Sequence, residues 1–258
     1  MTRNKLIAAA VQVRPVSRAI DKTIDQGVKL AGRAAERGAD IICLPEHWLP
    51  EEIIPTPVDP IPYFQSLAKD YGVTIVAGAF FERVKGQVWL SSPIINSKGR
   101  LLGRQFKVHL FWREKKLAKP GDTYQVFKLD GYKAGILVCY DVDFPEPSRI
   151  YALNGADIIL CPSRIIKGGN RPWQQYLTVR ALENRIPIIA PNVYAPPLFI
   201  GGTTIVSLRQ DPVRKIAHPR IRTITQQSEG IILESIDLPL HNRLRKLRFA
   251  DRRPETYQ

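Results

Sequence analysis

Two segments of the chain repeat each other, and this repeat constrains the fold more than any other feature of the sequence. Residues 38–48 read GADIICLPEHW and residues 155–164 read GADIILCPSR. An offset of 117 residues aligns the two copies and places Glu46 of the first opposite Ser163 of the second. Each copy contains a short, continuous apolar run, which is typical of a strand covered on both faces of its sheet. The chain is therefore predicted to contain two related halves.

The elements predicted around the two copies follow the same order in each half. The first half reads as a strand KLIAAAVQV, an amphipathic helix over 17–37, the strand of the first copy, a helix over 60–71, a strand GVTIVAGAF and a hairpin of VWLSSPIIN with LLGRQFKV. The second half reads as a strand YKAGILVCY, a helix over 146–154, the strand of the second copy, a helix over 172–185, a strand IPIIAPNV and a hairpin within GGTTIVSLRQDPVRKIAH.

Two units of this kind, each with one uncovered sheet face, are expected to bury those faces against each other and to keep their helices outside. The predicted fold is therefore of the α/β class, a four-layer α-β-β-α sandwich with an internal pseudo-twofold repeat. A doubly wound dinucleotide-binding sheet is the alternative, but no GxGxxG motif follows the first strand.

The length of 258 residues and the hydrophobic content of 44% suit one large domain, which we assign to residues 1–240. The apolar runs near the start are far shorter than the roughly 20 residues of a bilayer span, so a cytoplasmic protein is expected. The net charge of +14 would suit nucleic-acid binding, but no matching motif accompanies it, and a solvated basic surface is favoured. Residues 241–258 form a basic tail, either free or docked on a partner at an oligomer interface.

The three cysteines, Cys43, Cys139 and Cys161, are spaced too widely for a zinc motif or a dense disulfide framework. Cys43 and Cys161 lie inside apolar strands and are interpreted as packing residues. Cys139 ends the apolar run AGILV and precedes a polar loop that leads into a helix. A residue at such a strand end is either buried packing or a nucleophile presented at a cleft, where backbone N–H groups can meet a developing oxyanion.

A cysteine nucleophile needs a base or a cation beside it, and two charged residues at predicted strand ends are candidates. Glu46 directly follows a buried strand, where it is either a cap for the next segment or a base held in a cleft. Lys107 lies in the apolar and aromatic stretch GRQFKVHLFWREK, where it is either a surface lysine or a fixed buried charge. The spacing of the four histidines singles none of them out as a partner.

Three segments, LPEHW, GRQFKVHLFWREK and GILVCYDVDFPE, resemble in order and spacing the motifs of the nitrilase, or carbon-nitrogen hydrolase, superfamily. The resemblance implies an enzyme in which Cys139 is the nucleophile, Glu46 the general base and Lys107 the cation that stabilises the oxyanion. It further implies that the backbone N–H of Tyr140 completes the oxyanion hole and that Glu114 positions the lysine and the substrate. No metal and no organic cofactor are expected for this chemistry.

The resemblance also suggests a substrate class. The nucleophile motif CYD is similar to amidase-like branches, whereas nitrilases usually carry CWE, so hydrolysis of a small aliphatic amide through a cysteine thioester is expected. Asp143 stands where many members carry arginine, so a polar contact near the pocket or the dimer face is not expected to be kept. The predicted pocket rim consists of Trp48, Phe111, Trp112, Tyr140, Arg164 and Trp173, with Arg164 as a candidate for binding a substrate carboxylate.

Other functions stay open from the sequence alone. A nitrilase that acts on small aliphatic nitriles is the alternative within the same enzyme class. A non-catalytic binding or scaffold protein on the same fold is the alternative outside it, although the intact Glu46, Lys107 and Cys139 set argues against it. The expected partners are a small amide or nitrile and a second copy of the chain, because family members pair through the helices after the nucleophile. A homodimer or a higher even oligomer is therefore predicted.

Overall fold

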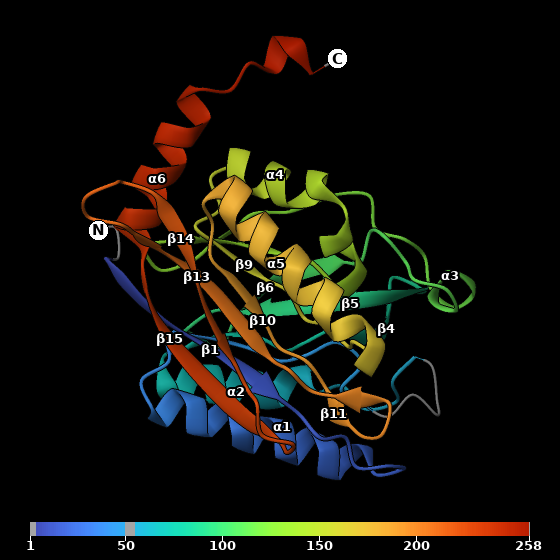
Figure 1. The fold of residues 1–258 in the computed structure, drawn as a ribbon. Helices are drawn as coiled ribbons and strands as arrows, with labels where there is room; N and C mark the ends of the chain where they lie inside the picture. The colour runs from blue at the N-terminus through green and yellow to red at the C-terminus, as the bar shows by residue number, and fades with distance from the viewer. Residues whose placement is uncertain (1–3, 50–54, 258) are drawn as a thin grey trace.

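Two β-sheets lie face to face between two layers of helices in the computed structural model, which describes residues 4–49 and 55–257 (Figure 1). The first sheet has the strand order β15 (Gly230–Asp237), β1 (Lys5–Gln12), β2 (Ile41–Cys43), β3 (Thr74–Val76), β5 (Gln87–Ile95) and β4 (Phe80–Val84), and β6 (Leu101–Phe106) also pairs with β5. The second sheet has the order β14 (Ala217–Thr223), β13 (Thr204–Gln210), β10 (Ile188–Ala190), β9 (Ile158–Leu160), β8 (Lys133–Ile136) and β7 (Phe127–Lys128). A small pair is formed by β11 (Tyr194–Ala195) and β12 (Phe199–Ile200).

The described residues form six α-helices, and the longer ones lie outside the pair of sheets (Figure 1). They are α1 (Ile20–Glu36), α2 (Ile61–Tyr71), α3 (Glu114–Leu117), α4 (Pro145–Leu153), α5 (Asn170–Asn184) and α6 (Leu238–Ala250). One apolar cluster fills the space between the sheets, a second lies between the first sheet and α1 with α2, and a third lies under α4 and α5. The predicted four-layer α-β-β-α sandwich is confirmed.

The internal repeat is visible in the strands and in their hydrogen bonds. Strands β2 and β9 begin and end at residues that differ by the predicted offset of 117, and each is parallel to both of its neighbours. The aspartate before each strand makes the same contact: Asp40 accepts the backbone N–H of Ile7 at 2.7 Å, and Asp157 accepts that of Lys133 at 2.8 Å. The carboxyl ends of β2 and β9 consequently face the same region of the molecule.

The predicted strand GVTIVAGAF is broken in the structure, because Gly78 separates β3 from β4. Gly78 has a φ of +79°, and a Cβ atom built on it would lie 2.2 Å from the carbonyl oxygen of Pro45. Beside this glycine the backbone N–H of Ala79 donates to Pro45 at 3.1 Å, and the N–H of His47 donates to Ala79 at 2.7 Å. The chain between β3 and β4 therefore packs closely against the segment that carries Glu46 and is hydrogen-bonded to it.

The C-terminal part of the chain adds elements to this sandwich that were not predicted. Strand β15 pairs antiparallel with β1 along its whole length, and α6 begins before the tail that was assigned to 241–258. His241 is buried and accepts the backbone N–H of Leu208 at 3.0 Å, and Arg245 donates to the carbonyl of Ala156 at 2.7 Å. The start of the predicted tail is thus held on the second sheet, whereas the chain beyond it extends away from the body (Figure 1).

None of the helices in the described part of the chain combines the length and the apolar character that a membrane span requires.

The close approach at Gly78 yields a stability prediction with an internal control. Gly78→Ala should destabilise the protein by about 2–5 kcal/mol, because left-handed backbone costs a non-glycine residue about 1–2 kcal/mol and overpacking against Pro45 adds about 1–3 kcal/mol. Gly86 has a similar φ of +81°, but a Cβ atom added there would have nothing within 4 Å, so Gly86→Ala should show only the backbone cost. Urea unfolding measures both values, and equal losses would contradict the packing role of Gly78.

Candidate active site

Three side chains that are far apart in the sequence meet at the ends of strands from both halves. Glu46 follows β2, Lys107 directly follows β6, and Cys139 follows β8. The Lys107 Nζ lies 2.7 Å from the Glu46 Oε1, and the Cys139 thiol hydrogen-bonds to the Glu46 carboxylate. All three are buried, and only 1% of Lys107 is exposed. The predicted grouping of an acid, a lysine and a cysteine is therefore present in the fold.

The ends of the two repeated strands also touch through the backbone. The N–H of Glu46 donates to the carbonyl of Ser163 at 3.3 Å, and the N–H of Cys139 donates to the carbonyl of Pro162 at 2.8 Å. Ser163 itself is fully buried, and its hydroxyl donates to the carbonyl of Cys161 at 2.9 Å. The second copy of the repeat thus supplies backbone acceptors to this site, whereas the first copy supplies the carboxylate.

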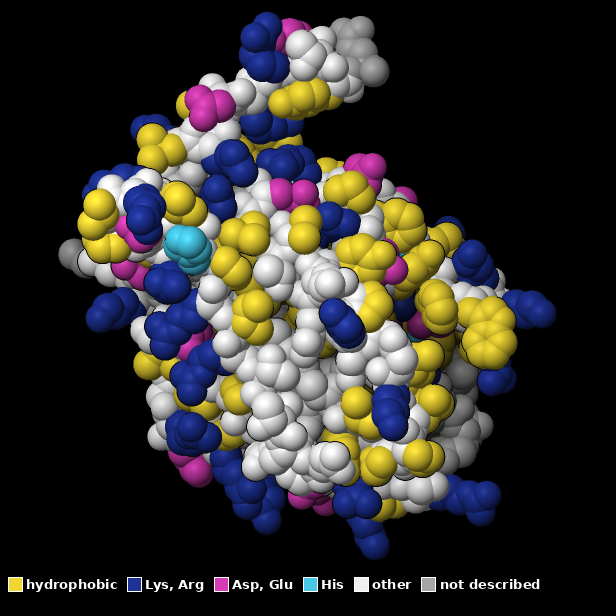
Figure 2. All heavy atoms as spheres, viewed as in Figure 1, with side chains coloured by type: hydrophobic (Ala, Val, Ile, Leu, Met, Phe, Trp, Pro, Cys, Tyr) yellow, Lys and Arg dark blue, Asp and Glu magenta, His cyan; other side chains and the backbone are white. Residues whose placement is uncertain are grey.

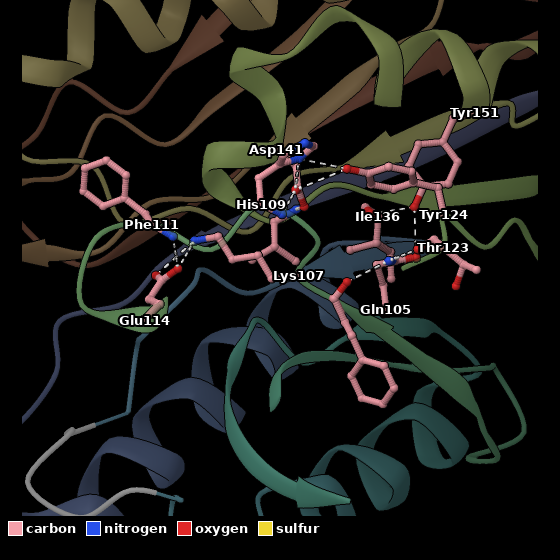
Figure 3. Close-up of polar contacts among 12 residues, drawn as sticks. Gln105, Lys107, His109, Phe111, Glu114, Thr123, Tyr124, Ile136, Asp141 and Tyr151 are labelled. Atoms are coloured by element: carbon pink, nitrogen blue, oxygen red, sulfur yellow. Dashed lines mark hydrogen bonds and ion pairs between the residues drawn. The ribbon is translucent and has the colours of Figure 1, made fainter. Parts of the chain in front are cut away.

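Glu114 is the second carboxylate that contacts the Lys107 ammonium (Figure 3). Its carboxylate oxygens lie 3.0 and 2.9 Å from the Lys107 Nζ, and it also accepts the backbone N–H of Phe111 at 2.7 Å. Burial raises the pKa of Glu114, but the hydrogen bond from His47 and the charge of Lys107 outweigh burial and lower this pKa to about 2. Burial likewise disfavours the ammonium of Lys107, but the charges of Glu46 and Glu114 raise its pKa above the usual value. The cluster therefore holds one ammonium between two carboxylates.

Cys139 begins a short 3₁₀ helix, η1 (Cys139–Asp143), and adopts a φ of +48°, a left-handed conformation that non-glycine residues seldom take. Burial and the Glu46 carboxylate raise the pKa of its thiol well above the ordinary value, although Lys107 and the backbone N–H of Arg164 act in the opposite direction. The resting cysteine is consequently a neutral thiol whose proton lies next to a carboxylate.

Asp141 links the turn that begins at Cys139 to the segment that follows Lys107, and Figure 3 shows its contacts with His109 and Tyr124. Its Oδ2 accepts the backbone N–H of Val138 at 3.0 Å. Its Oδ1 accepts from the backbone and from the ring Nδ1 of His109, both at 2.9 Å, and from the hydroxyl of Tyr124 at 3.3 Å. Asp141 is fully buried, so these contacts are shielded from water. It was not predicted as a site residue, although its place two residues after Cys139 was a signal.

The family of the chain follows from a match along nearly its whole length. A family model described as carbon-nitrogen hydrolase matches residues 7–246. The chain belongs to the carbon-nitrogen hydrolase family.

Individual members of the carbon-nitrogen hydrolase family carry different activity names. A nitrilase of Pyrococcus abyssi is 30% identical over 268 residues, which cover 96% of this chain and 98% of that protein. An omega-amidase of Xenopus tropicalis is 26% identical over 80% of this chain and 82% of its own length. The structure of a variant of an amidase from Nesterenkonia, of the nitrilase superfamily, superposes with a TM-score of 0.79 at 25% identity and covers 99% of this chain and 97% of that one. The chain is accordingly a carbon-nitrogen hydrolase with amidase and nitrilase relatives.

Glu46, His47 and Glu114 also form a group of the kind that can hold a metal ion. In this carbon-nitrogen hydrolase, however, the Lys107 ammonium already lies within 2.7–3.0 Å of oxygens of both carboxylates. A metal ion bound there would have to displace the ammonium, because the two cations cannot share the same oxygens at these distances without strong repulsion.

The residues predicted for the pocket rim divide into two sets. Trp48 and Trp173 are 0% and 3% exposed and lie in the outer apolar clusters, where Trp48 packs edge-on against Phe64. Their place in the core does not fit a role in lining a pocket, because each side chain is enclosed between its sheet and the covering helices.

The other predicted rim residues lie near the cysteine or on the surface. Tyr140 packs edge-on against Phe111 at 5.1 Å, and Trp112 is 75% exposed. The backbone N–H of Arg164 bonds to the Cys139 sulfur, while its guanidinium lies 5.1 Å from the ring centroid of Phe199. Asp143, the departure from the family pattern, is half-buried, and its backbone carbonyl accepts from Arg180 at 2.7 Å.

Proposed function

We propose that this carbon-nitrogen hydrolase cleaves small aliphatic amides through a thioester on Cys139, and releases ammonia and a carboxylic acid. The observation that carries the proposal is the buried contact of Glu46 with both the Cys139 thiol and the Lys107 ammonium. These are the groups that covalent hydrolysis of an amide requires: a nucleophile, an acceptor for its proton and a positive charge for the oxyanion.

In the first half of the reaction Glu46 accepts the thiol proton while the sulfur of Cys139 attacks the carbonyl carbon. The electron pair of the C=O bond moves onto oxygen, where Lys107 and the backbone N–H of Tyr140 stabilise the negative charge. Each such donor contributes about 3–4 kcal/mol to the transition state in comparable sites. Collapse of this intermediate breaks the C–N bond, and Glu46 returns its proton to the leaving nitrogen.

In the second half a water molecule replaces the ammonia. Glu46 accepts a proton from this water, whose oxygen attacks the thioester carbon, and the same donors stabilise the second oxyanion. Breaking the C–S bond releases the acid, and the proton on Glu46 returns to the sulfur. The cycle thereby restores the neutral thiol and the ionised carboxylate.

The surroundings of the two glutamates support the choice of Glu46 as the base. Glu114 accepts hydrogen bonds from Lys107, His47 and the backbone of Phe111, and its pKa is lowered to about 2, so it is a poor proton acceptor. Glu46 instead lies against the thiol. A pair of carboxylates in such different surroundings is suited to two different tasks.

An amide is favoured over a nitrile because the nucleophile motif reads CYD. The relatives named omega-amidase and the amidase structure from Nesterenkonia support this choice, whereas the relative named nitrilase supports the alternative of a small aliphatic nitrile. Ammonia release from amides and nitriles of matched chain length, such as butyramide and butyronitrile, separates the two. Faster turnover of the nitriles would contradict the proposed substrate class.

Trapping the acyl-enzyme tests the proposed roles of Cys139 and Glu46. Glu46→Gln should lower amide hydrolysis by about 10²–10⁴-fold, because the side chain no longer transfers protons. The variant loses the carboxylate that raises the pKa of the Cys139 thiol and keeps Lys107, which lowers it, so thiolate can form without Glu46. An activated ester of the same acid has a leaving group that needs no proton, so it should still acylate the variant, and the thioester should then accumulate. Intact-protein mass spectrometry followed by peptide mapping measures the adduct and its position.

The control for the trapping experiment is another buried cysteine. Cys161→Ala should leave the adduct unchanged, since Cys161 is fully buried in an apolar cluster, whereas Cys139→Ala should abolish it. An adduct that persists in Cys139→Ala would contradict the proposed nucleophile.

We further propose that two copies of the chain pair through the outer face of α4 and α5. Figure 2 shows apolar side chains gathered over these helices, and the exposed members are Ile150, Leu153, Tyr176 and Val179. An exposed apolar patch on two adjacent helices is typical of a protein–protein interface.

Sedimentation velocity tests the proposed pairing. The wild-type chain should sediment as a dimer or higher even oligomer at micromolar concentration, and Val179→Asp should dissociate it because it buries a charge in the interface. Val213 is 85% exposed in the turn between β13 and β14, so Val213→Asp serves as the control and should leave the assembly intact. A monomeric wild-type chain would contradict the proposal.

A further inference from the structure

His47 is a buried histidine that directly follows Glu46 and lies beside the reacting groups. Its Nε2 lies 3.0 Å from the Glu114 Oε1 and 3.9 Å from the Glu46 Oε1. Its ring packs against Phe81 with centroids 5.2 Å apart, and only 5% of the residue is exposed. The backbone at His47 has a φ of +48° and is held by the hydrogen bond to Ala79. The fold therefore keeps this ring in a strained and enclosed place.

We propose that His47 is a positioning residue, which holds the Glu114 carboxylate against Lys107 through its Nε2–H and thereby fixes the direction of the lysine ammonium. The inference rests on the proposed function, in which that ammonium stabilises the oxyanion. His47 does not reach the reacting atoms in this role, because it acts through Glu114.

The donors around Glu114 establish which nitrogen of His47 carries the proton. The Glu114 oxygens accept from the Lys107 ammonium at 2.9 and 3.0 Å and from the backbone N–H of Phe111 at 2.7 Å. A carboxylate surrounded by such donors is ionised and can only accept, so the Nε2 of His47 must be the donor in the 3.0 Å contact. The direction of this hydrogen bond is thus set by the partners of Glu114.

The geometry of the lysine explains why this contact matters for the reaction. An ammonium has three N–H bonds; among the described residues, the Glu46 Oε1 accepts one and the Glu114 Oε1 accepts another, while the Glu114 Oε2 lies 2.9 Å from the nitrogen as an ion pair. The remaining N–H is then available for an oxyanion. If Glu114 turned away or took up a proton, Lys107 would lose one of its two anchors and would move toward Glu46. That movement would misdirect the oxyanion donor and make Glu46 a weaker base.

The charges of the described residues around Glu114 show how His47 opposes protonation of this carboxylate. Glu46 is a second carboxylate bound to the same ammonium, so the group holds two negative charges and one positive charge beside a neutral thiol. Burial favours the protonated form of Glu114, and the hydrogen bond from His47 is the foremost contact that opposes burial, ahead of the charge of Lys107. Removing the ring should therefore raise the pKa of Glu114.

Three variants of the full-length chain test the inference. His47→Ala removes the donor, His47→Gln keeps an N–H group at a similar reach, and Phe81→Leu disturbs the packing of the ring while leaving the donor in place. For butyramide, His47→Ala should lower kcat/KM by about tenfold or more, mainly through kcat, because a hydrogen bond to a charged group is lost. KM should change less than kcat, because the lost contact orients the oxyanion donor and does not touch the bound amide. His47→Gln should restore most of this loss, and Phe81→Leu should leave kcat close to that of the wild type.

A direct titration separates this inference from the proposed function. Carbon-13 NMR of the glutamate carboxyls, with the Glu114 signal assigned from its loss in Glu114→Gln, should show that signal titrating at higher pH in His47→Ala than in the wild type. Circular dichroism establishes that each variant is folded. An unchanged Glu114 titration in folded His47→Ala, or a His47→Gln variant no better than His47→Ala, would overturn the positioning role. Absence of amide hydrolysis by the wild type would instead contradict the proposed function, and the titration would still decide the role of His47.

Discussion

The placement of one ammonium between two carboxylates is the constraint on which the rest of this structure depends. Moving a lysine and two glutamates out of water costs several kcal/mol for each ion, so the arrangement is stable only when the charges are held close and their remaining hydrogen bonds are satisfied. Here Lys107 lies within 3.0 Å of both Glu46 and Glu114. Glu46 lies after β2, whereas Lys107 and Glu114 lie at the two ends of the segment between β6 and α3, so the fold has to hold these two parts of the chain in a fixed relation.

The two halves of the sandwich provide that relation through backbone contacts. The end of β2 bonds to the end of β9 through Glu46 and Ser163, and the break at Gly78 accepts the same segment from the other side. Asp141 ties the cysteine turn to the lysine loop with four hydrogen bonds. His47 and Cys139 both adopt left-handed backbone, and this network of hydrogen bonds offsets the cost of that conformation. Cys139 is the proposed nucleophile, and His47 directly follows the proposed base.

The fold and the main chemical groups could be predicted from the sequence because both depend on local patterns. The repeated apolar runs predicted two related sheets, and the resemblance of three motifs to the carbon-nitrogen hydrolase family implied Glu46, Lys107 and Cys139 as the site. Contacts between residues that are far apart in the sequence are not marked by any local pattern. Asp141 bonds to His109 over 32 residues, and His47 bonds to Glu114 over 67, so neither partner could be inferred from spacing.

The structure adds two features that the sequence pattern does not show, for identifiable physical reasons. The positions of Trp48 and Trp173 near strand ends predict a place at the pocket rim, and in the structure both side chains lie in the outer apolar clusters. Hydrophobicity alone does not tell which side of a sheet an aromatic side chain will face. The strand GVTIVAGAF was read as continuous because the apolar pattern crosses Gly78 without interruption. The cause of the break is the close approach of the Pro45 backbone to Gly78, which the sequence pattern does not show.

The ionisation of Cys139 tests most directly whether this site works by transfer of a thiol proton to Glu46. Burial and the adjacent carboxylate raise the pKa of the thiol well above its ordinary value. The measurement is the ultraviolet absorbance of the thiolate across a pH titration, taken as the difference between the wild type and Cys139→Ala. We predict no thiolate signal from Cys139 at neutral pH, where the amide is hydrolysed. A thiolate that forms below neutral pH, as in a preformed cysteine–cation pair, would contradict activation by Glu46.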